Sequence, residues 1–122
     1  MTDVTDLGEE TVIVRDDLSE YLGLQTYQAR QALHVAIENI KVFDKKQLDY
    51  GSQNIAANPC PALGVAIRAN DKIQRIMNLL WNRRGEAANE PLDDAWLDLA
   101  NYGLIGYLVS NDQWLEPEVV SE

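Results

Sequence analysis

The sequence predicts an all-α protein: a bundle of three long helices preceded by short N-terminal elements. Apolar residues recur at spacings of three and four along residues 26–46, 62–82 and 92–109, which is the pattern of helices with one buried face. Short polar or proline-containing segments separate the three, as is typical of helical bundles. The 122 residues are enough for one compact domain with a modest core, and too few for two.

Composition divides the chain into an acidic arm at 1–25, a helical region at 26–110 and an acidic tail at 111–122. The formal net charge is −10, of which residues 1–20 carry −6 and the tail carries −4. The middle of the chain holds nine acidic and nine basic residues. A chain with this balance is a poor candidate for binding duplex nucleic acid or an anionic membrane through a general positive field.

The single cysteine, Cys60, cannot form an intrachain disulfide, which fits a reducing cytoplasm. The N-terminal residues do not resemble a signal peptide, and no stretch approaches the roughly 18 apolar residues of a membrane span. We therefore expect a cytoplasmic protein with no membrane partner. Cys60 lies between two prolines without a second thiol nearby, and we expect its role to be structural.

The acidic arm contains two short elements that the residue types predict. The β-branched run at 11–14 is typical of a short extended segment. Residues 16–22 can form a short helix, which Gly23 would end.

The first long helix should begin at Thr26, whose hydroxyl can accept from the free N–H groups of the first turn, and run to about Lys46. It should end before the turn formed by residues 49–51, where Gly51 suits a positive φ. Its expected buried stripe is Ala29, Ala32, Leu33, Ala36, Ile37, Ile40 and Phe43.

The second long helix should span about 62–82, and the third about 92–109 with Pro91 in its first turn. The third is apolar on nearly every side, and such a helix is either central or covered by a second subunit, so we expect a homo-oligomer. Trp114 and Leu115 should anchor the tail to the body or to a partner subunit. The expected buried stripe of the second helix is Leu63, Ala66, Ile67, Ile73, Ile76, Met77 and Leu80.

Polar residues interrupt these apolar helices in two stripes. Asp94, Asp98 and Asn101 share one face of the third helix. A carboxylate buried alone is costly, so Asp98 must meet a cation, a metal or several donors. The second helix carries a polar stripe opposite its expected core face: Arg68, Asp71, Lys72, Arg75 and Asn78.

The two stripes and the polar turn after the first helix are able to line one pocket. Its arginine and lysine side chains would bind phosphate, and its carboxylates would hold Mg²⁺. Tyr50, Gln53 and Asn54 would stack on or hydrogen-bond to a base. The alternative is that both stripes form ion pairs and a solvated surface, with Asp98 paired to one of the basic residues: Arg68, Lys72 or Arg75.

Three segments, at 48–51, 67–79 and 94–102, resemble the nucleotide-modification-associated domain 1 family of bacteriophages and some bacteria. They read as a DYG turn, an R-x-x-DK-x-x-R-x-x-NL helix and a D-x-x-x-D-x-ANY helix, in the family's order. The resemblance implies a role in phage nucleotide or modified-base metabolism, inside the host cytoplasm. It also implies a shared polar set: Asp49, Tyr50, Gly51, Arg68, Asp71, Lys72, Arg75, Asn78, Asp94, Asp98, Asn101 and Tyr102.

A more distant similarity is to the all-α nucleoside triphosphate pyrophosphohydrolases, which hold Mg²⁺ with carboxylates on neighbouring helices. Residues 98–101 would replace their E-x-x-D element with an amide at the last position, and the first helix offers a single glutamate, Glu38. Fewer carboxylates hold fewer metal ions. On this similarity Asp71, Asp94 and Asp98 are the candidate catalytic residues, and the last two are the candidate Mg²⁺ ligands.

These resemblances predict a phage-type protein that binds a small nucleotide. If it is an enzyme, the expected reaction is Mg²⁺-dependent cleavage of a nucleoside triphosphate to monophosphate and pyrophosphate. One alternative is a non-catalytic protein that sequesters a nucleotide, such as a cyclic signalling nucleotide of host defence. The other is a helical interaction protein without a ligand.

Overall fold

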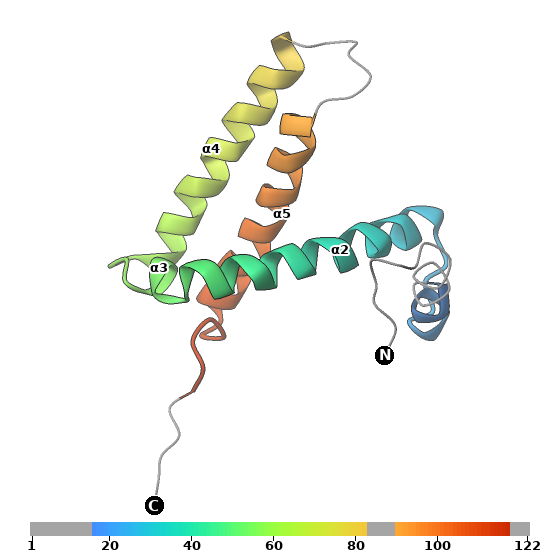
Figure 1. Cartoon of the computed structure of the whole chain (residues 1–122), viewed down its shortest axis with the longest axis horizontal. Coiled ribbons are helices and arrows are strands. Elements are labelled where there is room, and N and C mark those ends of the chain that lie inside the picture. The colour runs from blue at the N-terminus through green and yellow to red at the C-terminus, as the bar shows by residue number, and fades with distance from the viewer. Residues whose placement is uncertain (1–15, 83–89, 118–122) are drawn as a thin grey trace, which may run out of the picture. The chain divides into compact units, whose positions relative to one another are not determined.

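The computed structural model describes residues 16–82 and 90–117. No strand occurs in these ranges, which confirms the all-α class. A short helix at 16–21 precedes the elements labelled in Figure 1. These are α2 (Tyr27–Tyr50), α3 (Gln53–Ala56), α4 (Pro61–Asn82) and α5 (Glu90–Ser110). The extended run expected at 11–14 lies outside the described residues, and no helix within them combines the length and apolar character needed to cross a membrane.

Local capping confirms the predicted boundaries at the start of the helical region. The helix at 16–21 ends next to Gly23, whose φ of +69° is the left-handed conformation that glycine adopts without strain. The hydroxyl of Thr26 accepts from the amide of Ala29 at 3.1 Å, which satisfies one free N–H group of the first turn of α2.

The end of α2 differs from the prediction. The helix continues four residues past Lys46, through Tyr50, because residues 47–50 contain nothing that breaks a helix. It ends only at Gly51, where φ is +75° and the amide donates to the carbonyl of Gln47 at 2.8 Å. The predicted positive φ at Gly51 is therefore confirmed, and the predicted end of the helix is wrong.

The chain divides into two compact units, residues 1–42 and 43–122. In the first unit the expected apolar stripe of α2 is only partly covered. Ala29, Leu33 and Ile37 are half-buried, whereas Ala32, Ala36 and Ile40 are exposed, and the buried residue of α2 is Asn39. The described part of this unit offers only the six-residue helix at 16–21 as a partner for α2, which is too short to cover a stripe several turns long.

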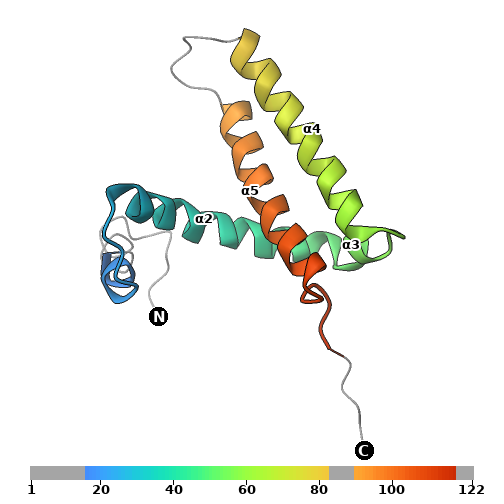
Figure 2. The same ribbon diagram turned by 180° about the vertical axis from the view of Figure 1, so that it is seen from behind.

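The second unit is built on α4 and α5, which lie side by side in both Figure 1 and Figure 2. Buried apolar residues from three elements form its core, namely Ile55 of α3, Val65 of α4 and Ile105 of α5. Half-buried residues pack around this cluster: Phe43, Tyr102, Val109 and Trp114.

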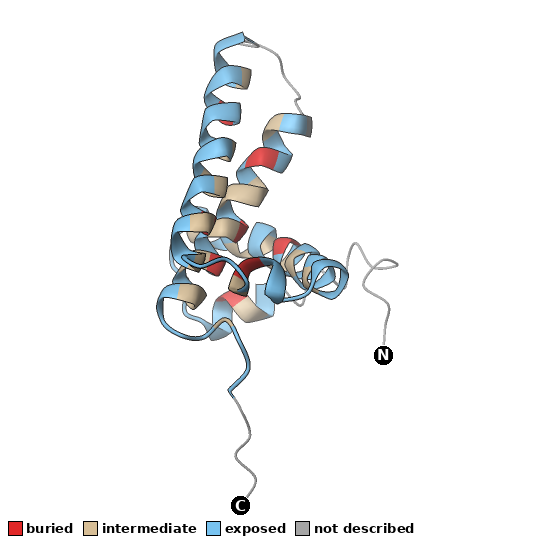
Figure 3. Ribbon diagram, turned by 90° about the vertical axis from the view of Figure 1, so that its left-hand side faces the viewer, coloured by how far each residue is buried: buried red, intermediate tan, exposed pale blue. Residues whose placement is uncertain are grey.

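The buried face of α4 is not the one that hydrophobicity predicts. Of the seven residues of the expected stripe only Ile76 is buried, and the other six are exposed (Figure 3). α5 packs instead against the side of α4 that carries Val65 and Ile76, where Lys72 also contacts Asp98 of α5. The buried and half-buried residues of α4 are Pro61, Gly64, Val65, Arg68, Ala69, Lys72, Ile76 and Leu79.

The segment after α5 is anchored to this unit by Trp114, as predicted. Asp112 adopts a φ of 56° and the amide of Gln113 donates to Leu108 at 2.8 Å, which ends α5 in a tight turn. The indole N–H of Trp114 then donates to the Ser52 carbonyl at 3.0 Å. Its ring meets that of Phe43 edge-to-face, with centroids 6.3 Å apart.

We expect Trp114→Ala to lower the free energy of unfolding by about 2–3 kcal/mol, somewhat less than a fully buried tryptophan would cost. Trp114→Phe keeps an aromatic ring and loses only the hydrogen bond to Ser52, so its cost should be about 1 kcal/mol. Denaturant unfolding measures both. The control is Tyr21→Ala, which removes an exposed aromatic ring and should cost less than about 0.5 kcal/mol. A Trp114→Ala variant as stable as the control would contradict the anchor.

Candidate functional site

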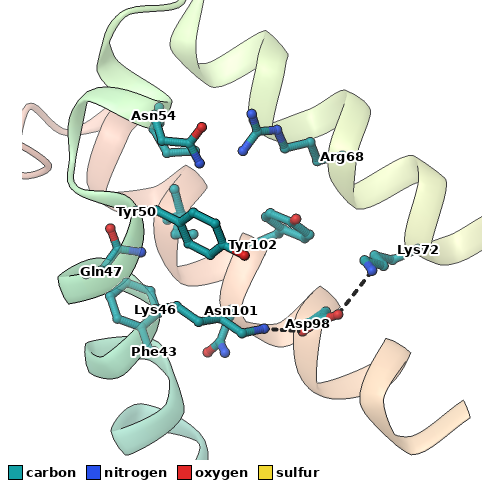
Figure 4. Close-up of a pocket in the computed structure, with 12 residues that line it drawn as sticks. Phe43, Lys46, Gln47, Tyr50, Asn54, Arg68, Lys72, Asp98, Asn101 and Tyr102 are labelled. Carbon is teal, nitrogen blue, oxygen red and sulfur yellow. Dashed lines mark hydrogen bonds and ion pairs between the residues drawn. The ribbon is translucent and has the colours of Figure 1, made fainter. Parts of the chain in front are cut away.

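A pocket of about 400 Å³ opens in the second unit between the C-terminal part of α2, α3, α4 and the middle of α5 (Figure 4). Its volume falls in the usual range for sites that hold small molecules. Its apolar lining residues are Phe43, Ile55 and Ile105. Its polar lining residues are Lys46, Gln47, Tyr50, Asn54, Arg68, Lys72, Asp98, Asn101 and Tyr102.

Helical spacing brings these side chains to one place. Residues three and four apart lie on the same helix face, and each long helix contributes such a set. The set on α4 is Arg68 and Lys72. The set on α5 covers two turns and consists of Asp98, Asn101, Tyr102 and Ile105. The set on α2 is Phe43, Lys46, Gln47 and Tyr50.

Asp98 lies between two lysines from two other helices. Lys46 Nζ of α2 is 2.9 Å from Asp98 Oδ1, and Lys72 Nζ of α4 is 3.1 Å from Asp98 Oδ2. The Asp98 side chain is 24% exposed, so the pair is only partly screened by water. Both oxygens of one carboxylate are thus engaged, and the three helices are held together at this point.

The same contacts shift the ionisation of the pair. Burial by itself raises the pKa of Asp98, but the hydrogen bonds and positive charges of Lys46 and Lys72 outweigh burial and hold that pKa below its usual range. The hydrogen bond to Asp98 raises the pKa of Lys46, against a smaller opposing effect of burial. The carboxylate and the ammonium group therefore both stay charged at neutral pH.

The pocket carries more positive than negative charge. Lys46, Arg68 and Lys72 line it together with one carboxylate, that of Asp98. Asp98 already serves both lysines, and Arg68 has no carboxylate partner among the residues that the structure describes. The pocket is therefore able to accept an anionic group.

Seven residues predicted for nucleotide binding or catalysis do line this pocket: Tyr50, Asn54, Arg68, Lys72, Asp98, Asn101 and Tyr102. Arg75 and Asp94 instead line an adjoining hollow of about 360 Å³, which shares Lys72 and Asp98 with the pocket. The other four predicted site residues line neither the pocket nor the hollow: Asp49, Gly51, Asp71 and Asn78.

Lys46 and Gln47 are pocket residues that the sequence reasoning missed. The signal was present, because Phe43, Lys46, Gln47 and Tyr50 follow the helical spacing of three and four. The predicted helix ended at about Lys46, so Gln47 and Tyr50 were not placed on the same helix face as Phe43 and Lys46.

The site offers few groups for a metal ion. No set of three or more His, Cys, Asp or Glu side chains able to hold one occurs within 16–82 and 90–117. Asp94 and Asp98, the predicted Mg²⁺ ligands, lie one turn apart beside the same hollow. A cation at Asp98 would share the carboxylate with two lysines, whose positive charges would repel it.

Comparison of the chain with models of protein families, with curated proteins and with solved structures finds no match in any of the three.

We expect Asp98→Asn to cost about 1–2 kcal/mol of unfolding free energy at neutral pH, between the values typical of exposed and buried pairs. Because the pKa of Asp98 is lowered, its contribution is complete above the unfolded value of about 3.9 and is lost as pH falls through the lower folded value. Because the pKa of Lys46 is raised, its contribution is complete below about 10.4 and is lost at higher pH. The stability cost of Asp98→Asn should therefore be constant between about pH 4 and pH 10 and should shrink toward pH 3.

Denaturant unfolding across this pH range measures the cost. The matched control is Asp93→Asn, which removes an exposed carboxylate from the same helix and should change stability by less than about 0.5 kcal/mol. An Asp98→Asn cost equal to that of the control, or one that stays unchanged at pH 3, would show that the pair does not stabilise the fold.

Proposed function

We propose that this protein binds a small nucleotide in the pocket formed by α2, α3, α4 and α5. The observation that carries the proposal is the combination of a net positive, partly enclosed pocket with a tyrosine ring and several amide groups in its wall. Phosphate requires the first feature and a nucleobase requires the second.

The phosphate end would lie at Arg68. Its guanidinium can donate two parallel hydrogen bonds to a phosphate, and no carboxylate among the described residues competes for it. Lys72 lies one turn further along α4, and its ammonium group adds positive charge beside Asp98. In Figure 4 the side chains of Arg68 and Lys72 both extend from α4 toward the pocket.

The base would lie at the α2 and α3 side of the pocket. Tyr50 is 69% exposed although its ring lines the pocket, so a planar ligand could cover a ring that the protein leaves open. Asn54 extends from α3 beside it, and its amide can both donate to and accept from a base edge. On the α5 side, the pocket wall includes the amide side chain of Asn101, which is a buried residue.

The resemblance to the nucleotide-modification-associated family supports the same proposal. The part of its shared polar set that lines this pocket is Tyr50, Arg68, Lys72, Asp98, Asn101 and Tyr102. A phage-type protein of nucleotide or modified-base metabolism is therefore our proposal for its biological class.

Hydrolysis of the bound nucleotide is the second candidate, favoured by the two carboxylates beside the adjoining hollow, Asp94 and Asp98. A Mg²⁺ ion held there would neutralise charge that develops on phosphate oxygens. Incubation of each nucleoside and deoxynucleoside triphosphate with Mg²⁺ separates the two activities. Monophosphate and pyrophosphate as products would assign hydrolysis, whereas a ligand recovered intact would favour a protein that sequesters a nucleotide, including one that counters host defence.

We expect at least one nucleoside triphosphate to stabilise the protein, by about 2.7 kcal/mol when its concentration is 100 times Kd. Arg68→Ala should weaken that binding by about 10-fold or more, because a hydrogen bond to a charged group contributes about 1.5–3 kcal/mol. Thermal unfolding with and without ligand, followed by calorimetric titration, measures both effects.

The matched control is Lys45→Ala, which removes a positive charge next to Lys46 from an exposed residue outside the pocket. It should leave Kd within about twofold, because an exposed charge is screened by solvent and salt. If no nucleotide shifts the unfolding temperature, the ion-paired interaction protein is left as the better interpretation. If both variants weaken binding equally, the nucleotide binds elsewhere and the proposed site is wrong.

Tyr50→Ala should weaken nucleotide binding by about 1–3 kcal/mol, the usual contribution of one base stacked on an aromatic ring, and should hardly change stability because the residue is exposed. Tyr50→Phe keeps the ring and should bind within a few-fold of the unchanged protein. Tyr27→Ala, which removes an exposed tyrosine from the first turn of α2, serves as the control in the same titration. Equal binding by the Tyr50→Ala and Tyr27→Ala variants would exclude stacking on Tyr50.

A further inference from the structure

Several large apolar side chains of α4 are exposed. On a helix with 3.6 residues per turn, Leu63, Ile67, Met77 and Trp81 lie on the side away from Val65 and Lys72, which face the core and the pocket. Ile73 and Leu80 lie along one edge of that side, and the exposed fractions of all six side chains are between 41% and 72%. On α5, Trp96, Leu104 and Tyr107 are also exposed.

Within residues 16–82 and 90–117 the apolar core is small compared with these exposed side chains. Among the described residues the buried apolar side chains are Ile55, Val65, Ile76, Ala95 and Ile105, and none of them is large and fully enclosed. Exposed apolar side chains scattered over a surface are ordinary, but six of them along one 22-residue helix about 33 Å long are typical of an interface.

The order of residues in this stripe identifies its occupant. The six positions at alternating spacings of four and three form an uncharged seam of the kind found in paired helices, which we call the α4 seam: Leu63, Ile67, Asn70, Gln74, Met77 and Trp81. From either end it reads as two apolar residues and then an amide. Because of this symmetry about the level of Lys72, an antiparallel second copy would set apolar residues against apolar residues and amides against amides.

We propose that a second copy of this chain covers the α4 seam, with the two α4 helices antiparallel about a two-fold axis at the level of Lys72. Ile67 then faces Met77 of the partner subunit, and Leu63 faces Trp81 of the partner subunit. At the centre, Asn70 faces Gln74 of the partner subunit, so that the two amides can hydrogen-bond to each other in place of water.

The residues that flank the seam favour the antiparallel direction over the parallel one. One flank is apolar, with Ala66, Ile73 and Leu80, and the other carries Gly64, Asp71 and Asn78. Antiparallel pairing places each flank against the same flank of the partner, whereas parallel pairing places the apolar flank against the polar one. Antiparallel pairing keeps Ile73 and Leu80 away from Asp71 and Asn78, and it brings the exposed Asp71 side chains of the two copies near each other, where solvent and salt screen their charges.

The first test is the mass of the full chain in solution, by sedimentation velocity over a range of concentrations. We expect a dimer, twice the 13.7 kDa of one chain. Met77→Lys places a charge in the seam and should raise the dimer dissociation constant at least tenfold. Asn82→Lys adds the same charge to an exposed residue of α4 outside the seam and should leave it unchanged. A monomer at high micromolar concentration would overturn the proposal.

The second test reads the direction of pairing and does not depend on a destabilised variant. Two chains, one with Ile67→Cys and one with Met77→Cys, are prepared in a Cys60→Ser background so that each holds a single thiol. When the two chains are mixed and oxidised, disulfides should form between unlike chains. When either chain is oxidised alone, few disulfide-linked dimers should form. Efficient cross-linking of Ile67→Cys chains to one another would show parallel helices, and no cross-linking in the mixture would place the interface elsewhere; either result overturns the proposed arrangement.

Discussion

The contact of Asp98 with Lys46 and Lys72 is the constraint on which the second unit depends. One partly buried carboxylate accepts from two ammonium groups on two other helices, at 2.9 and 3.1 Å. A carboxylate in this position is costly without a partner, and removal of either lysine would leave it less compensated. The contact therefore fixes the rotation of α4 about its axis and brings the C-terminal turns of α2 to the same place.

That rotation has two consequences for the molecule. Turning Lys72 toward α5 also turns Arg68 inward, which gives the pocket a positive side chain without a carboxylate partner among the described residues. The same rotation turns Ile67, Met77 and Trp81 to the outside. The proposed nucleotide site and the proposed dimer seam are thus two sides of one helix, and each would be lost if α4 packed by its apolar face.

Local features of the fold were predictable because local chemistry determines them. The N-cap at Thr26, the end of the short helix before Gly23 and the positive φ of Gly51 depend on residues a few positions away, and all three appear where the sequence predicts them. Much of the candidate site was predictable for the same reason, since polar residues at helical spacing share a face. Lys46 was not predicted as a pocket residue because the sequence specifies the end of this helix only weakly, and the predicted helix stopped four residues before its actual end.

By itself, the sequence determined that the protein is all-α and where its long helices lie, because periodicity and capping act within a few turns. It also marked Asp98 as a carboxylate in need of a partner. Only the tertiary structure decided which face of α4 is buried and which cations meet Asp98, one of them 52 residues away in the chain. An apolar stripe normally predicts the buried face, but here α4 turns Val65, Lys72 and Ile76 toward the core, and the stripe is left for another surface to cover.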